Sequence, residues 1–134
     1  MGLEECIGLV ADRWRLKYVV FYGSRARGYG GPHSDYDLAV KAGRRLSLGD
    51  RGLLYSELGE CVDGALDLVF IDDWNPIVVW EALTWGRLVY TCGPSCTKEY
   101  YYDLAKAIDE VADLQPLIDL FRREYRRALT RLSS

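Results

Sequence analysis

The chain has 134 residues, of which 49% are hydrophobic and 28% charged, so it is long enough for one domain and too apolar to be disordered. A formal net charge of −3 excludes a general electrostatic attraction to nucleic acid. The sequence shows no apolar run that would span a membrane and no apolar segment of a signal peptide, which predicts a cytoplasmic protein.

An amphipathic helix is predicted over residues 3–14, followed by two strands that flank a glycine-rich turn. Four apolar residues recur at helical spacing in the first segment: Leu3, Ile7, Val10 and Trp14. The apolar runs at 19–22 and 38–40 are typical of buried strands. We expect the helix to pack one of its faces on the sheet that contains these strands.

The turn after the first strand has the features of a phosphate-binding site. Gly23 ends the strand, and Ser24 is a good N-cap for a short helix that begins at Arg25. Free amides at a helix start, a serine hydroxyl and the guanidinium of Arg25 or Arg27 together suit a phosphate group. The glycines and the proline within 28–32 then predict a loop.

Asp35 and Asp37 follow this loop at the start of the second strand. Residues two apart in a strand point to the same side of the sheet, about 6.6 Å apart along the chain, so the two carboxylates share a face and Tyr36 points the other way. Two carboxylates this close repel each other unless a cation lies between them, and Mg²⁺ prefers oxygen ligands. A phosphate-binding turn beside such a pair is the arrangement expected of a nucleotidyl-transfer site.

The next helix is predicted from Ser47, which with Asp50 resembles a capping box, to about Glu60. A strand over 65–71 follows, with Asp67 on the face opposite its apolar neighbours. A buried aspartate in an apolar strand is costly unless it is paired or binds a metal, which makes Asp67 a candidate ligand. The alternative is a carboxylate at the strand edge that faces solvent.

The last part of the chain predicts two helical regions with a short strand between them. Asn75-Pro76 is a typical helix start, Gly86 is placed to end that helix, and 87–90 predict a strand. A further helix opens at 100–102, and Pro116 is expected to break or kink it.

The segment 116–132 predicts a basic amphipathic helix. From Asp119 to the end of the sequence, five arginines oppose Asp119 and Glu124, a local charge of +3 that leaves −6 on the remainder. We interpret this helix in two ways, as a solvated face over a core stripe or as a docking face for an acidic partner or RNA.

The four cysteines divide into Cys92 and Cys96, which have three residues between them, and the separate Cys6 and Cys61. A zinc site is disfavoured because the one histidine, His33, lies in the loop before Asp35. Reduced thiols are therefore expected. Disulfides, in either pairing, would fit a hyperthermophile source.

The segment from Gly23 to Asp37 resembles the G-S-x10-D-x-D signature of the polymerase-β-like nucleotidyltransferases, most closely the minimal nucleotidyltransferases (MNT proteins). Gly23-Ser24 is followed by ten residues and then by Asp35-Tyr36-Asp37. Gly28 and Ser34-Asp35 also match the family pattern, and Asp67 fits its third carboxylate from a later strand.

The resemblance implies a Mg²⁺-dependent enzyme that uses ATP. It assigns catalysis and two Mg²⁺ ions to Asp35, Asp37 and Asp67, and nucleotide binding to Gly23, Ser24, Arg25, Arg27 and Ser34. MNT proteins are commonly antitoxins paired with HEPN ribonuclease toxins, and members of the family transfer AMP to a tyrosine of the toxin. The resemblance therefore predicts a protein adenylyltransferase with a HEPN partner.

We predict one α+β domain over residues 1–134, the palm of a nucleotidyltransferase. Its sheet is expected to be mixed and largely antiparallel, with about four strands, helices on one face and the carboxylates on the open face. Three alternatives to toxin adenylylation stay open: transfer to a small molecule such as an aminoglycoside, transfer to an RNA end, and stoichiometric binding with little catalysis. A homodimer or a partner interface through Trp74, Trp80 and Trp85 is a further expectation.

Overall fold

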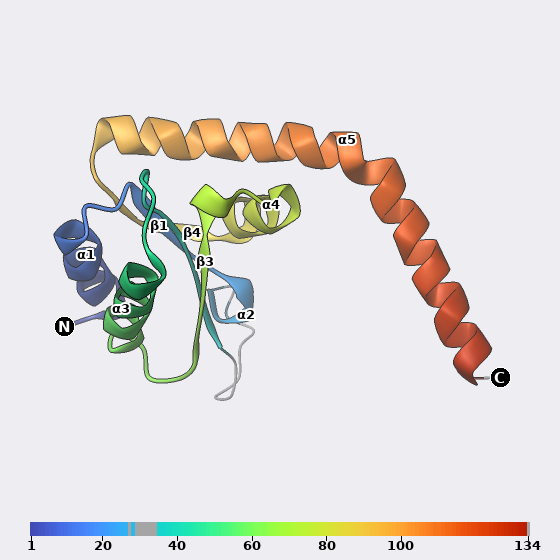
Figure 1. Ribbon diagram of the computed structural model, residues 1–134, viewed down its shortest axis with the longest axis horizontal. Coiled ribbons are helices and arrows are strands. Elements are labelled where there is room, and N and C mark those ends of the chain that lie inside the picture. The colour runs from blue at the N-terminus through green and yellow to red at the C-terminus, as the bar shows by residue number, and fades with distance from the viewer. Residues whose placement is uncertain (27, 29–34, 134) are drawn as a thin grey trace.

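Four strands form one open sheet with the order β3-β2-β1-β4, seen in the computed structural model, which describes residues 1–26, 28 and 35–133 (Figure 1). The strands are β1 (Tyr18–Tyr22), β2 (Tyr36–Lys41), β3 (Leu66–Phe70) and β4 (Arg87–Thr91). β1 is antiparallel to β2 and β4, whereas β2 and β3 are parallel. The predicted α+β class and its mixed, largely antiparallel sheet are confirmed.

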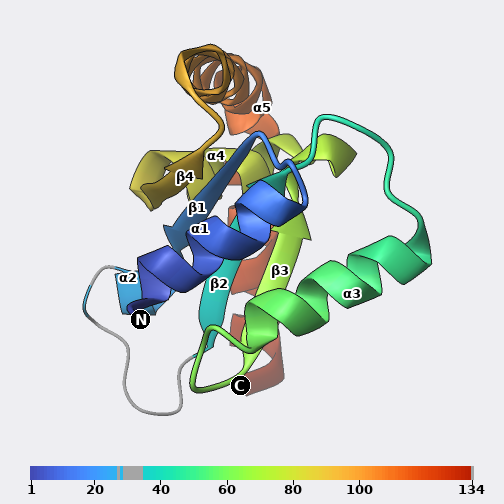
Figure 2. The same cartoon turned by 90° about the vertical axis from the view of Figure 1, so that its left-hand side faces the viewer.

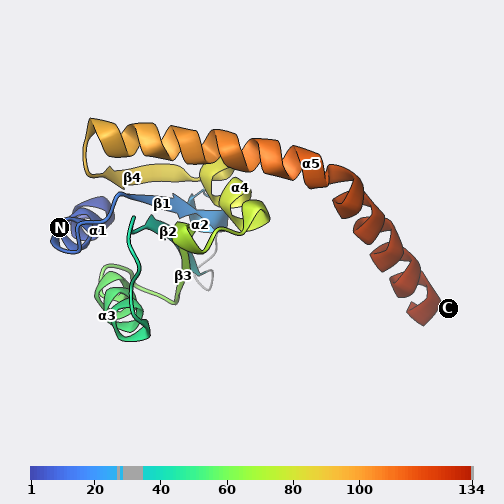
Figure 3. The same ribbon diagram turned by 45° about the horizontal axis from the view of Figure 1, so that its top comes forward.

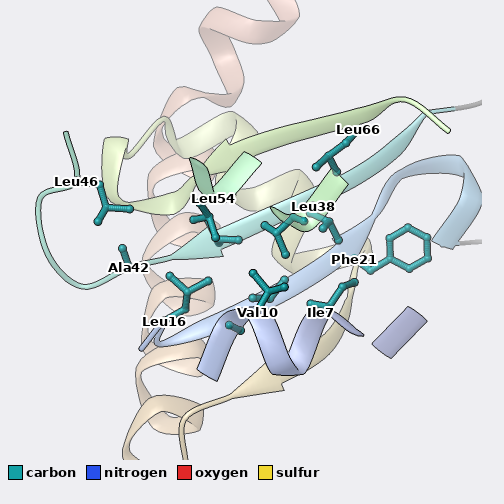
Figure 4. Close-up of a cluster of buried hydrophobic side chains, with 13 residues drawn as sticks. Ile7, Val10, Leu16, Phe21, Leu38, Ala42, Leu46, Leu54 and Leu66 are labelled. Atoms are coloured by element: carbon teal, nitrogen blue, oxygen red, sulfur yellow. The ribbon is translucent and has the colours of Figure 1, made fainter. Parts of the chain in front are cut away.

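One face of the sheet is covered by α1 (Leu3–Arg13) and α3 (Leu48–Gly59) (Figure 2). The predicted spacing places Ile7 and Val10 of α1 in a core with Leu38 of β2 and Leu54 of α3 (Figure 4). α3 begins as predicted, because the Ser47 side chain accepts a hydrogen bond from the backbone N–H of Asp50 at 3.1 Å.

The opposite face is covered by α4 (Pro76–Trp85) and by the first half of α5 (Pro94–Ser133), which corrects the expectation of helices on one face only. All five residues of β1 are buried, so this strand requires cover on both sides. Tyr18, Val20 and Tyr22 of β1 lie in this second core with Val79 and Leu83 of α4.

α4 begins at its predicted cap, where the Asn75 side chain accepts from the N–H groups of Ile77 and Val78. The three tryptophans that were expected at an interface differ in how exposed they are. Trp74 and Trp80 are half-buried against the second core, and Trp85 is exposed. A short 3₁₀ turn, η1 (Ile71–Asp73), joins β3 to this helix.

α5 is one helix of 40 residues that continues through Pro116. Figure 1 shows a bend along it, after which the helix leaves the sheet, so the proline kinks this helix instead of ending it. Its first half is held to the sheet by Asp103, which is buried and accepts from the hydroxyl of Tyr18 at 2.7 Å and from Nζ of Lys41 at 2.9 Å.

Two disulfides replace the reduced thiols that the sequence favoured. Cys6 of α1 is bonded to Cys61 after α3, with Cα atoms 5.6 Å apart, and Cys92 is bonded to Cys96 across 5.5 Å. The first pair was beyond sequence analysis because 55 residues separate partners that only the packing of α1 against α3 brings together.

Candidate active site

Asp37 and Asp67 lie side by side on adjacent strands. The parallel pairing of β2 with β3 places Asp37 directly opposite Asp67, and the antiparallel pairing of β1 with β2 places Tyr22 on its other side. Alternation along β2 and β3 puts both carboxylates on the face of Ala39 and Val69, which is the face that α4 covers. The fold thus joins two predicted site residues that are thirty positions apart in the sequence.

Burial and the charges around Asp37 raise its pKa to about 6 from an ordinary 3.8. Burial is the largest cause, followed by the negative charges of Asp67 and Asp35, a hydrogen bond with the Asp67 side chain and the charge of Glu81. The pKa of Tyr22 is also raised, by burial first and then by Asp37, Asp67 and Glu81. The site therefore concentrates negative charge.

Glu81 is a site neighbour that sequence analysis missed. It lies on the exposed side of α4 and acts electrostatically on both Asp37 and Tyr22. The sequence offered one signal, because Glu81 is an isolated acid in a mostly apolar helix. The helix periodicity alone did not show which face of that helix meets the carboxylates.

Gly23 is required where it stands. Its φ of +82° is left-handed, and a Cβ added there would collide with Oδ2 of Asp37. The Asp37 carboxylate therefore packs directly on the backbone where β1 turns into α2 (Gly23–Ala26). Ser24 is the second residue of α2, and its side chain lies outside what the structure describes, as do Arg27, His33 and Ser34.

Arg25 contacts Tyr36 of β2. Its Nη1 donates to the hydroxyl of Tyr36 at 2.9 Å, and its guanidinium lies over the Tyr36 ring at 4.2 Å from the centroid. The Tyr36 hydroxyl donates in turn to Asp63, and its ring stacks on Phe21 in the core beneath α1 and α3. The Tyr36 side chain thus lies on the face opposite Asp37.

Asp67 is exposed rather than buried, because β3 is an edge strand. The alternative prediction, a carboxylate at the strand edge that faces solvent, therefore describes the exposure of Asp67 correctly. Within the described part of the chain, no group of three or more His, Cys, Asp and Glu side chains is arranged to hold a metal ion. The crowded oxygens of Asp37 and Asp67 nevertheless suit Mg²⁺ in kind, with Asp35 acting on Asp37 less strongly than Asp67 does.

A family model described as "Polymerase beta, Nucleotidyltransferase" matches residues 4–93. Since this match spans more than half of the sequence, the chain belongs to that nucleotidyltransferase family. The matched region holds all four strands, Gly23 and the three predicted carboxylates. No curated protein is similar enough in sequence to match this chain.

The chain is similar in fold to several solved structures. One is a toxin–antitoxin structure with AMP-PNP, at 22% identity and a TM-score of 0.73, over 89% of this chain and 98% of the other. Another is an MNT antitoxin in complex with tri-AMPylated HEPN toxin from Shewanella oneidensis, at 21% identity and a TM-score of 0.68, over 90% and 96%.

A third similar structure is the spectinomycin adenyltransferase AAD(9) from Enterococcus faecialis, with ATP and spectinomycin. It shares 12% identity and a TM-score of 0.53, over 83% of this chain and 65% of the other. At such identities the likeness establishes the fold alone. Among the helices of the described residues, none has the length and apolarity that a membrane span requires.

Proposed function

We propose that this chain is a Mg²⁺-dependent adenylyltransferase that transfers AMP from ATP to a tyrosine of a HEPN ribonuclease toxin, and so acts as the antitoxin. The observation that carries the proposal is the adjacent pair of Asp37 and Asp67 at the Gly23 turn, in a chain of the nucleotidyltransferase family. The fold shared with an MNT antitoxin bound to AMPylated HEPN toxin supports the choice of acceptor.

In this proposal Asp37 and Asp67, with Asp35, hold Mg²⁺, which when bound supplies positive charge at the triphosphate and lowers the pKa of the attacking hydroxyl. Asp67 is exposed at the sheet edge, where a hydroxyl of another protein has access to it. It accepts the proton of the acceptor hydroxyl as that oxygen bonds to the α-phosphorus. The bond from the α-phosphorus to the bridging oxygen breaks, and pyrophosphate leaves with the electron pair.

The turn after β1 is assigned to the nucleotide phosphates. The Gly23 and Ser24 amides lie where the Asp37 carboxylate meets the backbone, next to the proposed reacting group. Ser24, Arg27 and Ser34 keep their predicted role on the phosphates. Arg25 keeps its predicted role there as well, and it also contacts Tyr36.

Coverage of the similar structures favours a protein acceptor over a small molecule. The chain matches 98% and 96% of the two toxin–antitoxin chains, whereas it matches only 65% of the spectinomycin adenyltransferase. Transfer to an aminoglycoside-like drug is the second candidate, supported by the fold that the two proteins share.

The test requires a HEPN protein encoded by the reading frame next to this chain, and it measures the intact mass of that protein after incubation with the chain, Mg²⁺ and each nucleoside triphosphate in turn. We expect an added AMP with ATP, absent with Asp37→Asn and retained with Asp109→Asn, an exposed aspartate on α5. Modification of spectinomycin but not of the HEPN protein would select the second candidate. No modification of either, with wild-type nucleotide binding, would contradict both.

A further inference from the structure

α5 carries one apolar stripe whose residues recur at alternating spacings of three and four, the spacing of a coiled-coil seam. The stripe begins with Tyr100, Leu104, Ala107, Val111 and Leu114. It continues without interruption past Pro116 through Ile118, Phe121, Tyr125, Ala128 and Leu132. We name residues 117–133 the arm.

The two halves of this stripe differ in what covers them. On the first half, Tyr100, Ala107 and Val111 are buried, with exposed fractions of 7%, 0% and 8%. On the arm, Phe121, Tyr125 and Leu132 are 65%, 67% and 84% exposed. Figures 1 and 3 show the arm running away from the sheet, where none of the other labelled elements reaches it.

A helix is the shape that fits the arm. Its seam repeats at heptad spacing, so a second helix is the element whose side chains interlock with it along the whole length. A short helix that projects into water is also only marginally stable by propensity, so a partner helix would stabilise it. The exposed aliphatic and aromatic groups together exceed the scattered apolar residues that a protein surface normally carries.

The charge of the arm selects the kind of partner. Five arginines against Asp119 and Glu124 give it a charge of +3, with Arg122 and Arg131 beside the seam. A second copy of the arm would bring the same charge, which disfavours pairing of this chain with itself. RNA would satisfy the arginines but leave Phe121 and Leu132 exposed, and the −6 on the remaining residues repels it.

We infer that the arm binds an acidic amphipathic helix of the acceptor protein as a short intermolecular coiled coil. Phe121 and Tyr125 are its anchors, and together with Arg122 and Glu124 they line a shallow hollow of about 580 Å³ that an apolar side chain of the partner can enter. Naming the partner as the acceptor rests on the proposed function, whereas the helical, acidic chemistry of the partner rests on the arm alone.

The first test uses the whole chain and two labelled helical peptides that share the same apolar seam but carry either glutamate or lysine beside it. We expect the glutamate peptide to bind and the lysine peptide to bind far more weakly, measured by fluorescence anisotropy. Tyr125→Ser should weaken binding by about tenfold or more. Tyr102→Ser is the matched control, since Tyr102 is an equally exposed tyrosine on the outer side of the same helix, and it should change binding less than twofold.

Arg122→Glu/Arg131→Glu should reverse the preference between the two peptides. The inference would be overturned by equal binding of both peptides, by equal weakening by Tyr102→Ser, or by binding of a single-stranded RNA probe with neither peptide bound. Arm-dependent dimerisation in sedimentation experiments, with no peptide binding, would overturn it in favour of a second copy.

A second measurement separates this inference from the proposed function. Complex formation with the neighbouring HEPN protein is measured without nucleotide, using chains that carry Asp37→Asn alone or with Tyr125→Ser. A complex that Tyr125→Ser disrupts, with no AMP transfer by the wild-type chain, supports the inference and contradicts the proposed function. AMP transfer with an unchanged KM for the acceptor in Tyr125→Ser supports the function and contradicts the inference.

Discussion

Each end of β1 carries a tyrosine that lies beside acidic side chains, but only one of the two acidic clusters also contains a cation in the part of the chain that the structure describes. At one end, Tyr18 lies beside the acids Asp103 and Glu99, and Lys41 sits between them, with Nζ at 2.9 Å from Asp103 and 3.7 Å from Glu99. At the other end, Tyr22 lies beside Asp37, Asp67 and Glu81, and no ion pair of these acids occurs among the described residues.

Both clusters lie on the face that α4 and α5 cover, so burial alone does not explain the difference. In the first cluster, which we call the completed cluster, Lys41 compensates the charge of the acids, and the hydrogen bonds to Asp103 fix α5 to the sheet. The second, which we call the incomplete cluster, has no such cation among the described residues, and burial followed by the charges of Asp67 and Asp35 raises the pKa of Asp37 to about 6. A protein keeps such a cluster at a cost to its stability, which indicates a site that a ligand completes.

The largest expected effect is on catalysis. Asp37→Asn removes a proposed Mg²⁺ ligand and should lower the rate of AMP transfer by about a thousandfold or more, since metal stabilisation of the transition state contributes several kcal/mol. Circular dichroism should show an unchanged fold. Activity within tenfold of wild type would show that the incomplete cluster is not the catalytic site.

Disrupting the cluster of Tyr18, Lys41 and Asp103 should lower the stability of the fold. Lys41→Met leaves Asp103, which is buried, without its cation and should lower the free energy of unfolding by about 3 kcal/mol, measured by urea denaturation. Lys17→Met is the control, because Lys17 pairs with Glu99 at 3.9 Å on the surface and should cost less than about 1 kcal/mol. Equal losses from both variants would contradict a structural role specific to Lys41.

Asp37→Asn should also stabilise the folded chain in the absence of metal. The pKa of Asp37 is raised on folding from 3.8 to about 6, so the folded state binds more protons than the unfolded state between these values. Stability therefore falls as pH rises through this window, and the full cost is present above about pH 6. The asparagine variant avoids that cost, which we place at about 1 kcal/mol after allowing for solvent screening.

Thermal unfolding with a metal chelator checks this prediction. The variant should melt above wild type at pH 7.5, and the difference should disappear near pH 4. Mg²⁺ should raise the Tm of wild type more than that of the variant. A variant that melts below wild type at pH 7.5 would contradict the view that the cluster is strained by its own charges.

Much of the incomplete cluster was predictable from the sequence, because local spacing defines it. The G-S-x10-D-x-D pattern marked Gly23, Asp35 and Asp37, and the apolar strand around Asp67 marked the third carboxylate. The caps at Ser47 and Asn75 were equally local and are confirmed. These features depend only on residues that are close in the sequence, which is why they could be predicted without a structure.

The completed cluster and the second helical layer were not predictable in the same way. Tyr18, Lys41 and Asp103 meet only after a helix beginning at Pro94 folds back along β1, and no short pattern joins them. The contact of Arg25 with Tyr36, whose hydroxyl donates to Asp63, was equally hard to predict because Asp63 is distant in sequence. The Cys6–Cys61 disulfide depends likewise on the packing of α1 against α3.

The smallest expected effect compares the two tyrosines of β1 directly. The Tyr18 hydroxyl donates to buried Asp103 at 2.7 Å, so Tyr18→Phe leaves that carboxylate with one donor fewer and should cost about 1–2 kcal/mol of unfolding free energy. The Tyr22 hydroxyl makes no hydrogen bond among the described residues, so Tyr22→Phe should change stability by less than about 0.5 kcal/mol. Urea denaturation of both variants measures the difference. A cost for Tyr22→Phe as large as that for Tyr18→Phe would show that Tyr22 is tied into a completed network, which would remove the distinction between the two ends of β1.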